Sequence, residues 1–93
     1  MAEVKPGKYA GGNGQWPADI GPVFAAPAPS PFLNVARWEV TADRAGYLGM
    51  LERLDDGAGP RWRAVYPDHR NGPRRAARWE AVRDMVERKR SKQ

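Results

Sequence analysis

The chain has 93 residues, a formal net charge of +5 and no cysteine. This length holds at most one domain with a small core, and the lack of cysteine excludes disulfides and thiolate metal sites. A small domain without disulfides is predicted to be cytoplasmic, or part of a particle assembled there. No apolar run approaches the roughly 18 residues of a membrane span, and the first residues lack the apolar middle of a signal peptide, so no membrane association is expected.

Residues 1–32 are rich in proline and glycine. They contain six of the nine prolines and five of the ten glycines, and neither helical nor strand periodicity persists there. We predict an extended arm outside the folded domain, interrupted by large apolar side chains suited to binding another protein. An alternative is that the arm folds back over its own sheet. The predicted protein-binding residues are Tyr9, Trp16, Ile20, Phe24 and Phe32.

The folded domain is expected at residues 33–90, followed by a basic tail at 91–93. Apolar and polar residues alternate in "NVARWEVT" (34–41) and "RWRAVYP" (61–67), and this period of two predicts two half-buried strands. The intervening segment, residues 41–60, is ambiguous. Thr41 is a suitable helix N-cap, but two glycines weaken a helix there. "DDGAGP" (55–60) is dense in turn residues and favours a hairpin, with a helix as the alternative.

The C-terminal segment is predicted to be an amphipathic helix. Asn71 is the expected cap and Pro73 suits the first turn. An apolar stripe at helical spacing follows, formed by Ala76, Trp79, Val82 and Val86. We expect Trp79 to pack near Trp38 and Trp62. The fold class is therefore α+β: an antiparallel sheet of about three strands, packed on one helix and preceded by the arm.

The positive charge is concentrated at the C-terminus, where residues 70–93 carry nine Lys or Arg and three Asp or Glu. One flank of the predicted helix is basic, so it offers a surface for DNA or RNA; the simpler interpretation is a solvated basic face. Arg37, Arg61 and Arg63 would share a sheet face with acidic residues that repel phosphate. The candidate nucleic-acid-binding residues are Arg74, Arg75, Arg78, Arg88, Lys89 and Lys92.

Catalytic patterns are sparse. His69 is the single histidine and lies in a turn-like sequence, so no metal site, cofactor or small-molecule substrate is expected. The sequence therefore predicts a non-catalytic assembly protein. Its arm would bind a larger protein assembly, such as a virion- or ribosome-like particle, or a homo-oligomer. Nucleic-acid binding through the C-terminal helix and tail is the alternative function.

Overall fold

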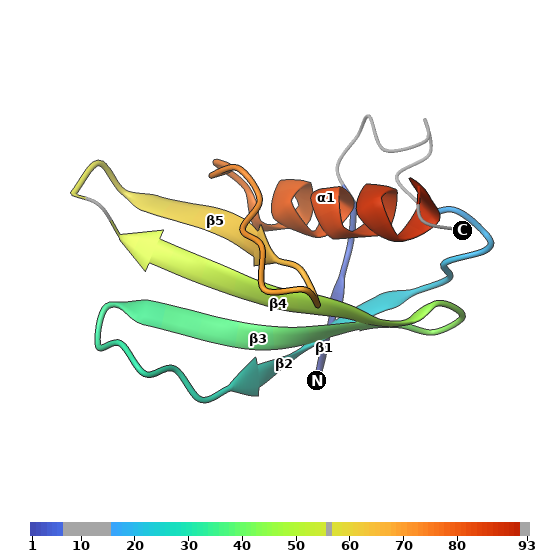
Figure 1. Ribbon diagram of the computed structural model, residues 1–93, viewed down its shortest axis with the longest axis horizontal. Coiled ribbons are helices and arrows are strands. Elements are labelled where there is room, and N and C mark those ends of the chain that lie inside the picture. Colours follow the sequence, from blue (N-terminus) through green and yellow to red (C-terminus); the bar gives the residue numbers. More distant parts are fainter. Residues whose placement is uncertain (7–15, 56, 92–93) are drawn as a thin grey trace.

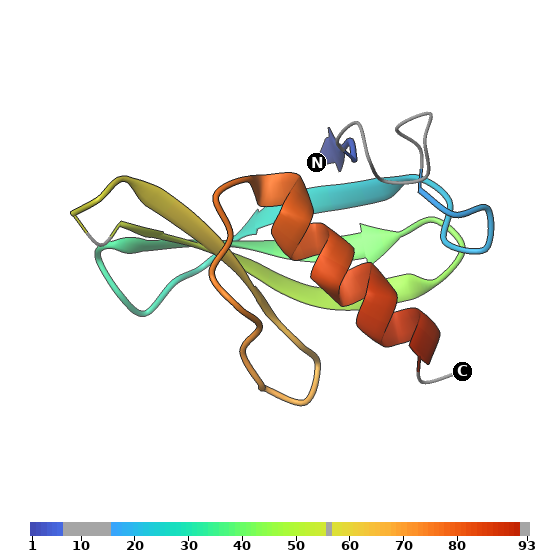
Figure 2. The ribbon, with the colours of Figure 1, turned by 90° about the horizontal axis from the view of Figure 1, so that it is seen from above.

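The computed structural model describes residues 1–6, 16–55 and 57–91. Five antiparallel strands form one sheet in the order β1-β2-β3-β4-β5, and one C-terminal helix lies slanted across one face of it (Figures 1 and 2). Every strand neighbours the next one in the sequence, so the sheet is a simple meander. The elements are β1 (Ala2–Val4), β2 (Val23–Ala28), β3 (Val35–Ala42), β4 (Gly46–Asp55), β5 (Pro60–Val65) and α1 (Arg78–Ser91).

The α+β class and the C-terminal helix are confirmed, but the expected number of three strands is wrong. The segment that was ambiguous in the sequence is β4, which pairs with β3 on one side and β5 on the other. The hairpin interpretation is therefore correct for this segment. Gly49 lies at a β-bulge, where the β3–β4 register shifts between Val40 and Thr41. Such an irregularity explains why the alternation of β4 is hard to read from the sequence.

The predicted arm is not confirmed, because residues 1–32 supply both additional strands. β2 pairs with β3 along its whole length, and β1 covers only the Val23–Ala25 part of its outer edge. Pro27 lies in the part that β1 leaves uncovered. A proline is tolerated at a sheet edge because its missing N–H is not needed there, and it also discourages pairing with another chain. The prolines that indicated an unstructured arm are thus compatible with an edge strand.

The helix begins at Arg78, seven residues after the predicted cap Asn71. The chain between them runs back along the outer edge of β5, where the Gly72 N–H donates to the Ala64 carbonyl over 2.7 Å. Arg75 and Trp62 exchange two further backbone hydrogen bonds of 2.6 and 2.9 Å. This pairing holds the segment extended and protects the edge of β5. At the helix start, the Ala77 N–H donates to Oε1 of Glu80 over 3.0 Å, which satisfies one of the free donors of the first turn.

The core lies between α1 and the sheet. Val82 and Met85 of the helix are buried with Val40, Leu48 and Leu51 of the sheet. The Trp38 and Trp62 rings pack with their centroids 5.5 Å apart, as expected from the strand pattern. Trp79 is partly buried and packs against the buried core residues. The segment predicted to be an arm also contributes, since the core includes Val4, Ile20, Val23 and Ala25.

A buried ion pair ties α1 to the segment that precedes it. Nε and Nη2 of Arg75 both donate to the carboxylate of Asp84, each over 2.9 Å, and the Asp84 side chain is buried. Asp84→Asn is expected to lower the free energy of unfolding by about 2 kcal/mol, because a charge-assisted bidentate pair is lost in a desolvated place. Urea unfolding measures this change. Glu87→Gln, one turn later at an exposed i,i+4 pair with Arg83, is the control and should change it by less than about 0.5 kcal/mol. Equal effects of the two substitutions would contradict a structural role for Asp84.

Candidate functional site

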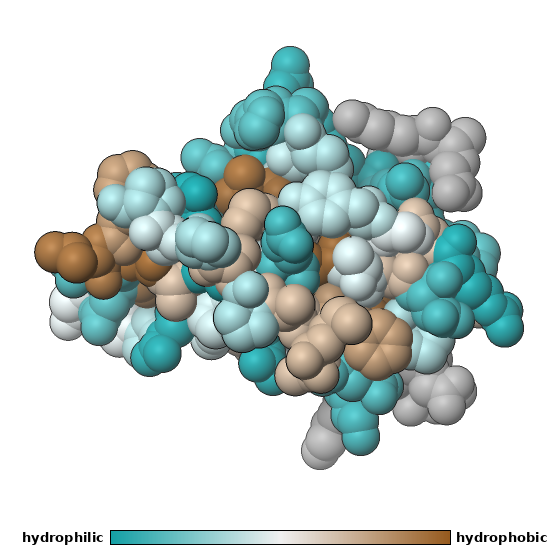
Figure 3. Space-filling model, turned by 90° about the horizontal axis from the view of Figure 1, so that it is seen from below, coloured by the Kyte–Doolittle hydropathy of each residue, from teal (hydrophilic) through white to brown (hydrophobic). Residues whose placement is uncertain are grey.

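One face of the sheet carries α1, and no helix of the described residues lies over the opposite face. Leu51 points into the core beneath α1, so its strand neighbours Met50 and Glu52 point to the opposite side. Residues directly across neighbouring antiparallel strands share a face, and the pairing register therefore assigns the remaining members. We call this surface the open face; it comprises Phe24, Ala26, Ala28, Val35, Arg37, Glu39, Thr41, Tyr47, Met50, Glu52, Leu54, Arg61, Arg63 and Val65. Figure 3 views the molecule from this side and shows hydrophobic and hydrophilic side chains mixed across it.

At the centre of the open face, Glu52 is held between two arginines. Arg37 of β3 and Arg63 of β5 lie directly opposite it in the register. Their Nε–H groups donate to Oε2 and Oε1 of Glu52 over 2.6 and 2.8 Å, and only 1% of Glu52 is exposed. One carboxylate thus fixes two guanidinium groups on the sheet. We call this set the Arg–Glu–Arg triad.

A groove of about 570 Å³ opens beside the triad. The strands provide its floor, and the loop after β5 provides one wall with Tyr66, Pro67, His69 and Asn71. His69 has a φ of 69°, a left-handed conformation that histidine adopts more readily than most residues. The strand residues that line the groove are Arg37, Tyr47, Met50, Glu52, Arg63 and Val65.

The wall loop is fastened to the helix. Arg88 of α1 donates to the Asp68 carboxylate, and its guanidinium stacks over the Tyr66 ring at 4.1 Å from the centroid. Burial, followed by the nearby charge of Asp84, raises the pKa of Tyr66. The hydroxyl therefore stays protonated at neutral pH. These contacts fix the wall of the groove, so Arg88 has a structural role.

Tyr47 stands at the edge of the groove and is 44% exposed. Partial burial of its ring, followed by the charge of Glu39, raises the pKa of Tyr47, so its hydroxyl also remains a neutral donor and acceptor. Glu39 is itself exposed on the same face. The groove thus combines apolar side chains, neutral hydroxyl groups and the cationic triad.

The candidate nucleic-acid-binding residues are divided among different parts of the fold. Arg75 is engaged by Asp84 and Arg88 by Asp68, whereas Arg74 and Arg78 are exposed near the helix start. Lys89 lies eleven residues after Arg78 in α1, about 16 Å along the helix axis. Lys92 lies outside the described residues. The described residues of this set therefore do not form one continuous surface. Arg78 and Arg53 both lie over the Trp62 ring, at 6.0 and 5.9 Å from its centroid.

The candidate protein-binding residues are likewise separated. Ile20 is fully buried, and Trp16 packs against the core while its indole N–H donates to the Val4 carbonyl over 2.7 Å. Ile20 is therefore not available as an anchor for a partner, whereas Trp16 is only partly buried. Phe24 is half-buried on the open face, and Phe32 is 60% exposed in the loop between β2 and β3. Tyr9 lies outside the described residues.

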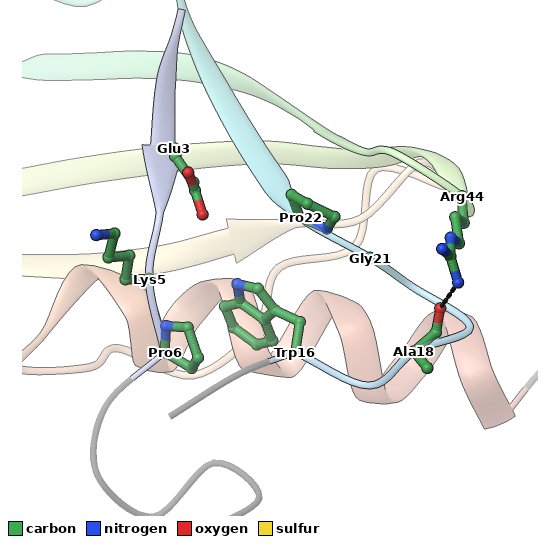
Figure 4. A pocket seen from close by; sticks show the side chains of 8 residues that line it. All are labelled: Glu3, Lys5, Pro6, Trp16, Ala18, Gly21, Pro22 and Arg44. Carbon is green, nitrogen blue, oxygen red and sulfur yellow. Dashed lines mark hydrogen bonds between the residues drawn. The ribbon is translucent and has the colours of Figure 1, made fainter. Parts of the chain in front are cut away.

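A second hollow, of about 580 Å³, lies beside β1 (Figure 4). Trp16 and Pro6 line it on one side, and Arg44 donates to the Ala18 carbonyl over 3.0 Å at its other end. Residues 7–15 connect Pro6 to Trp16 and lie outside the described residues, so we assign no function to this hollow.

No family model, curated protein or solved structure matches this chain. In the described residues, no helix is long and apolar enough to cross a membrane. Nor do three or more histidine or carboxylate side chains gather as metal ligands within that part of the chain. The choice of the open face and its groove as the candidate site is therefore based on the geometry of the structure alone.

Proposed function

We propose that this protein is a non-catalytic interaction protein that binds a partner protein through the open face. The observation that carries the proposal is the composition of that face. Phe24, Tyr47, Met50 and Val65 are half-buried or exposed there, and no helix or strand of the described chain lies over them. A solvated sheet face is usually polar, whereas an apolar surface next to a few fixed charges is typical of a binding interface.

The rigidity of the open face supports the same function. Its side chains project from four hydrogen-bonded strands, β2 to β5, rather than from loops. A surface that is already ordered loses little entropy when a partner binds. The fixed wall loop and the fixed arginines add to this preorganisation.

Assembly on a larger particle remains part of the proposal, with the point of attachment moved from the arm to the open face. Phe32 and the fully exposed Leu33 form an apolar tip in the loop between β2 and β3. This tip is a second place where a large assembly would contact the molecule. Two contact sites on one small domain suit a protein that bridges neighbouring subunits.

Site-specific photo-cross-linking tests the proposal. A benzophenone amino acid is placed at Tyr47 on the open face, and in a control protein at Glu87, which is exposed on α1. We expect cells that produce the Tyr47 form to yield a protein adduct of one defined mass, and the purified partner to form the same adduct. The Glu87 form should yield none. Adducts from Glu87 alone would contradict the proposal.

Nucleic-acid binding stays the alternative, and one observation favours it. Two guanidinium groups lie over the Trp62 ring, and arginine next to an aromatic ring is suited to stacked bases. This alternative requires association with DNA or RNA that weakens steeply with salt and is reduced by Arg78→Gln. The partner-protein proposal expects no such dependence on Arg78.

A further inference from the structure

The Arg–Glu–Arg triad leaves hydrogen-bond donors unused on two residues that line the groove. Each guanidinium uses its Nε–H on Glu52, while Arg37 and Arg63 both line the groove. The hydrogen bonds of the described chain give their terminal Nη groups no acceptor. The end of a guanidinium formed by its two Nη atoms matches both oxygens of a carboxylate or two oxygens of a phosphate. The triad is therefore chemically suited to an oxyanion.

The charges of the site favour a carboxylate over a polyanion. The triad carries two positive charges and one negative charge, which leaves a net charge of +1 for a ligand to neutralise. Glu39 lies exposed on the same face, two residues from Arg37 on β3, and would repel a chain of phosphates. One negatively charged group fits this balance, and a nucleic-acid backbone does not.

The groove also has room and lining for the rest of a protein side chain. Met50, Val65 and Pro67 contribute apolar atoms, and Asn71 contributes a neutral amide. The methylene groups of an acidic side chain, or an apolar neighbour in its sequence, would bury surface against these residues. The combination is suited to a peptide segment rather than to a free inorganic ion.

We infer that the groove binds an aspartate or glutamate side chain from an acidic segment of the partner protein, with the carboxylate held by the Nη groups of Arg37 and Arg63. This inference rests on the proposed function and assigns the chemistry of its partner. Tyr47, at the edge of the groove, is placed to donate its hydroxyl to the same segment.

Small probes test the site without the partner. The Arg37 and Arg63 Nε–H resonances are followed by NMR during titration with N-acetyl-glutamate methylamide and, as the neutral isostere, N-acetyl-glutamine methylamide. We expect saturable shifts with the glutamate probe. The glutamine probe should bind at least roughly tenfold more weakly, since hydrogen bonds between charged groups are stronger than those to a neutral amide. Equal shifts with both probes, or tighter binding of inorganic phosphate than of the glutamate probe, would overturn the inference.

Substitutions test whether the planar guanidinium group, with its two Nη donors, contributes to carboxylate binding beyond its charge. The double variant Arg37→Lys, Arg63→Lys keeps both charges and should weaken the glutamate probe by roughly tenfold, because lysine lacks the planar fork. Its binding is measured by calorimetry, and its fold is checked by near-ultraviolet circular dichroism of the Trp38–Trp62 pair. Arg61→Lys, on the same side of β5 but outside the groove, is the matched control and should bind normally. If the double variant does not fold, the comparison of the glutamate and glutamine probes on the unmodified protein decides whether the groove binds a carboxylate.

The two proposals fail separately. A partner that cross-links to position 47 while the glutamate probe does not bind would refute the carboxylate site and leave the interaction function standing. Saturable probe binding without any adduct at position 47 would support the carboxylate site and refute the proposed partner protein.

Discussion

Gly49→Ala is expected to lower the free energy of unfolding by about 3–4 kcal/mol, as measured by urea unfolding. Gly49 has a φ of +133° at the bulge of β4, and an added Cβ would lie 2.5 Å from the backbone oxygen of Val65. Alanine rarely adopts this conformation, and the colliding atom belongs to the neighbouring strand rather than to a flexible side chain. Relief therefore requires β4 and β5 to move apart, which disturbs the core beneath them.

Gly46→Ala separates the effect of backbone strain from that of the steric clash with β5. Gly46 also has a positive φ, +77°, but an added Cβ there has no atom within 4 Å. This variant should lose about 1 kcal/mol from backbone strain alone. If Gly49→Ala lost no more stability than Gly46→Ala, the close approach between β4 and β5 would be refuted.

Glu52→Gln is expected to lower the free energy of unfolding by about 3 kcal/mol. The substitution keeps the size of the side chain but removes the charge that holds Arg37 and Arg63. Two guanidinium groups would then lie close together over a nearly buried neutral side chain, whose amide offers them one acceptor instead of two. Urea unfolding measures the loss. The same substitution should also abolish saturable binding of the glutamate probe, because the two arginines are no longer fixed.

Glu39→Gln is the matched control, since Glu39 lies on the same face but is exposed. It should change the free energy of unfolding by less than about 0.5 kcal/mol. Unchanged stability in Glu52→Gln would show that the triad does not organise the open face.

Several elements were predictable because their patterns are local. Trp38 and Val40 alternate with polar residues along β3, and Val82 and Val86 recur at helical spacing in α1, so each element shows its buried side in its own sequence. These patterns were sufficient for the α+β class and for the Trp38–Trp62 pair.

Other features depend on pairing between distant segments. The prolines of β2 indicate a loop when read alone, and only the position of Pro27 at a sheet edge reconciles them with a strand. The late helix start has a similar cause, because the residues after Asn71 pair with β5 rather than coil. Neither pairing leaves a local signal in the sequence.

The candidate site could be predicted only in fragments. Arg37 and Arg63 were placed on one sheet face together with acidic residues, but the sequence does not show that Glu52 is the carboxylate that pairs with both. Its role becomes visible only once the register puts it between the two arginines. Trp16 and Ile20 were predicted as anchors for a partner because they are large and apolar. Those same properties bury Ile20 in the protein's own core and pack Trp16, partly buried, against it.

The three methionines provide the most direct test of binding through the open face. Met50 lies on that face, Met85 of α1 is buried in the core, and Met1 is exposed at the N-terminus. Methyl NMR of the protein labelled at methionine, titrated with the partner captured at position 47, should move or broaden the Met50 signal strongly. The Met85 and Met1 signals should stay nearly unchanged. A complex in which Met1 responds and Met50 does not would contradict the central claim.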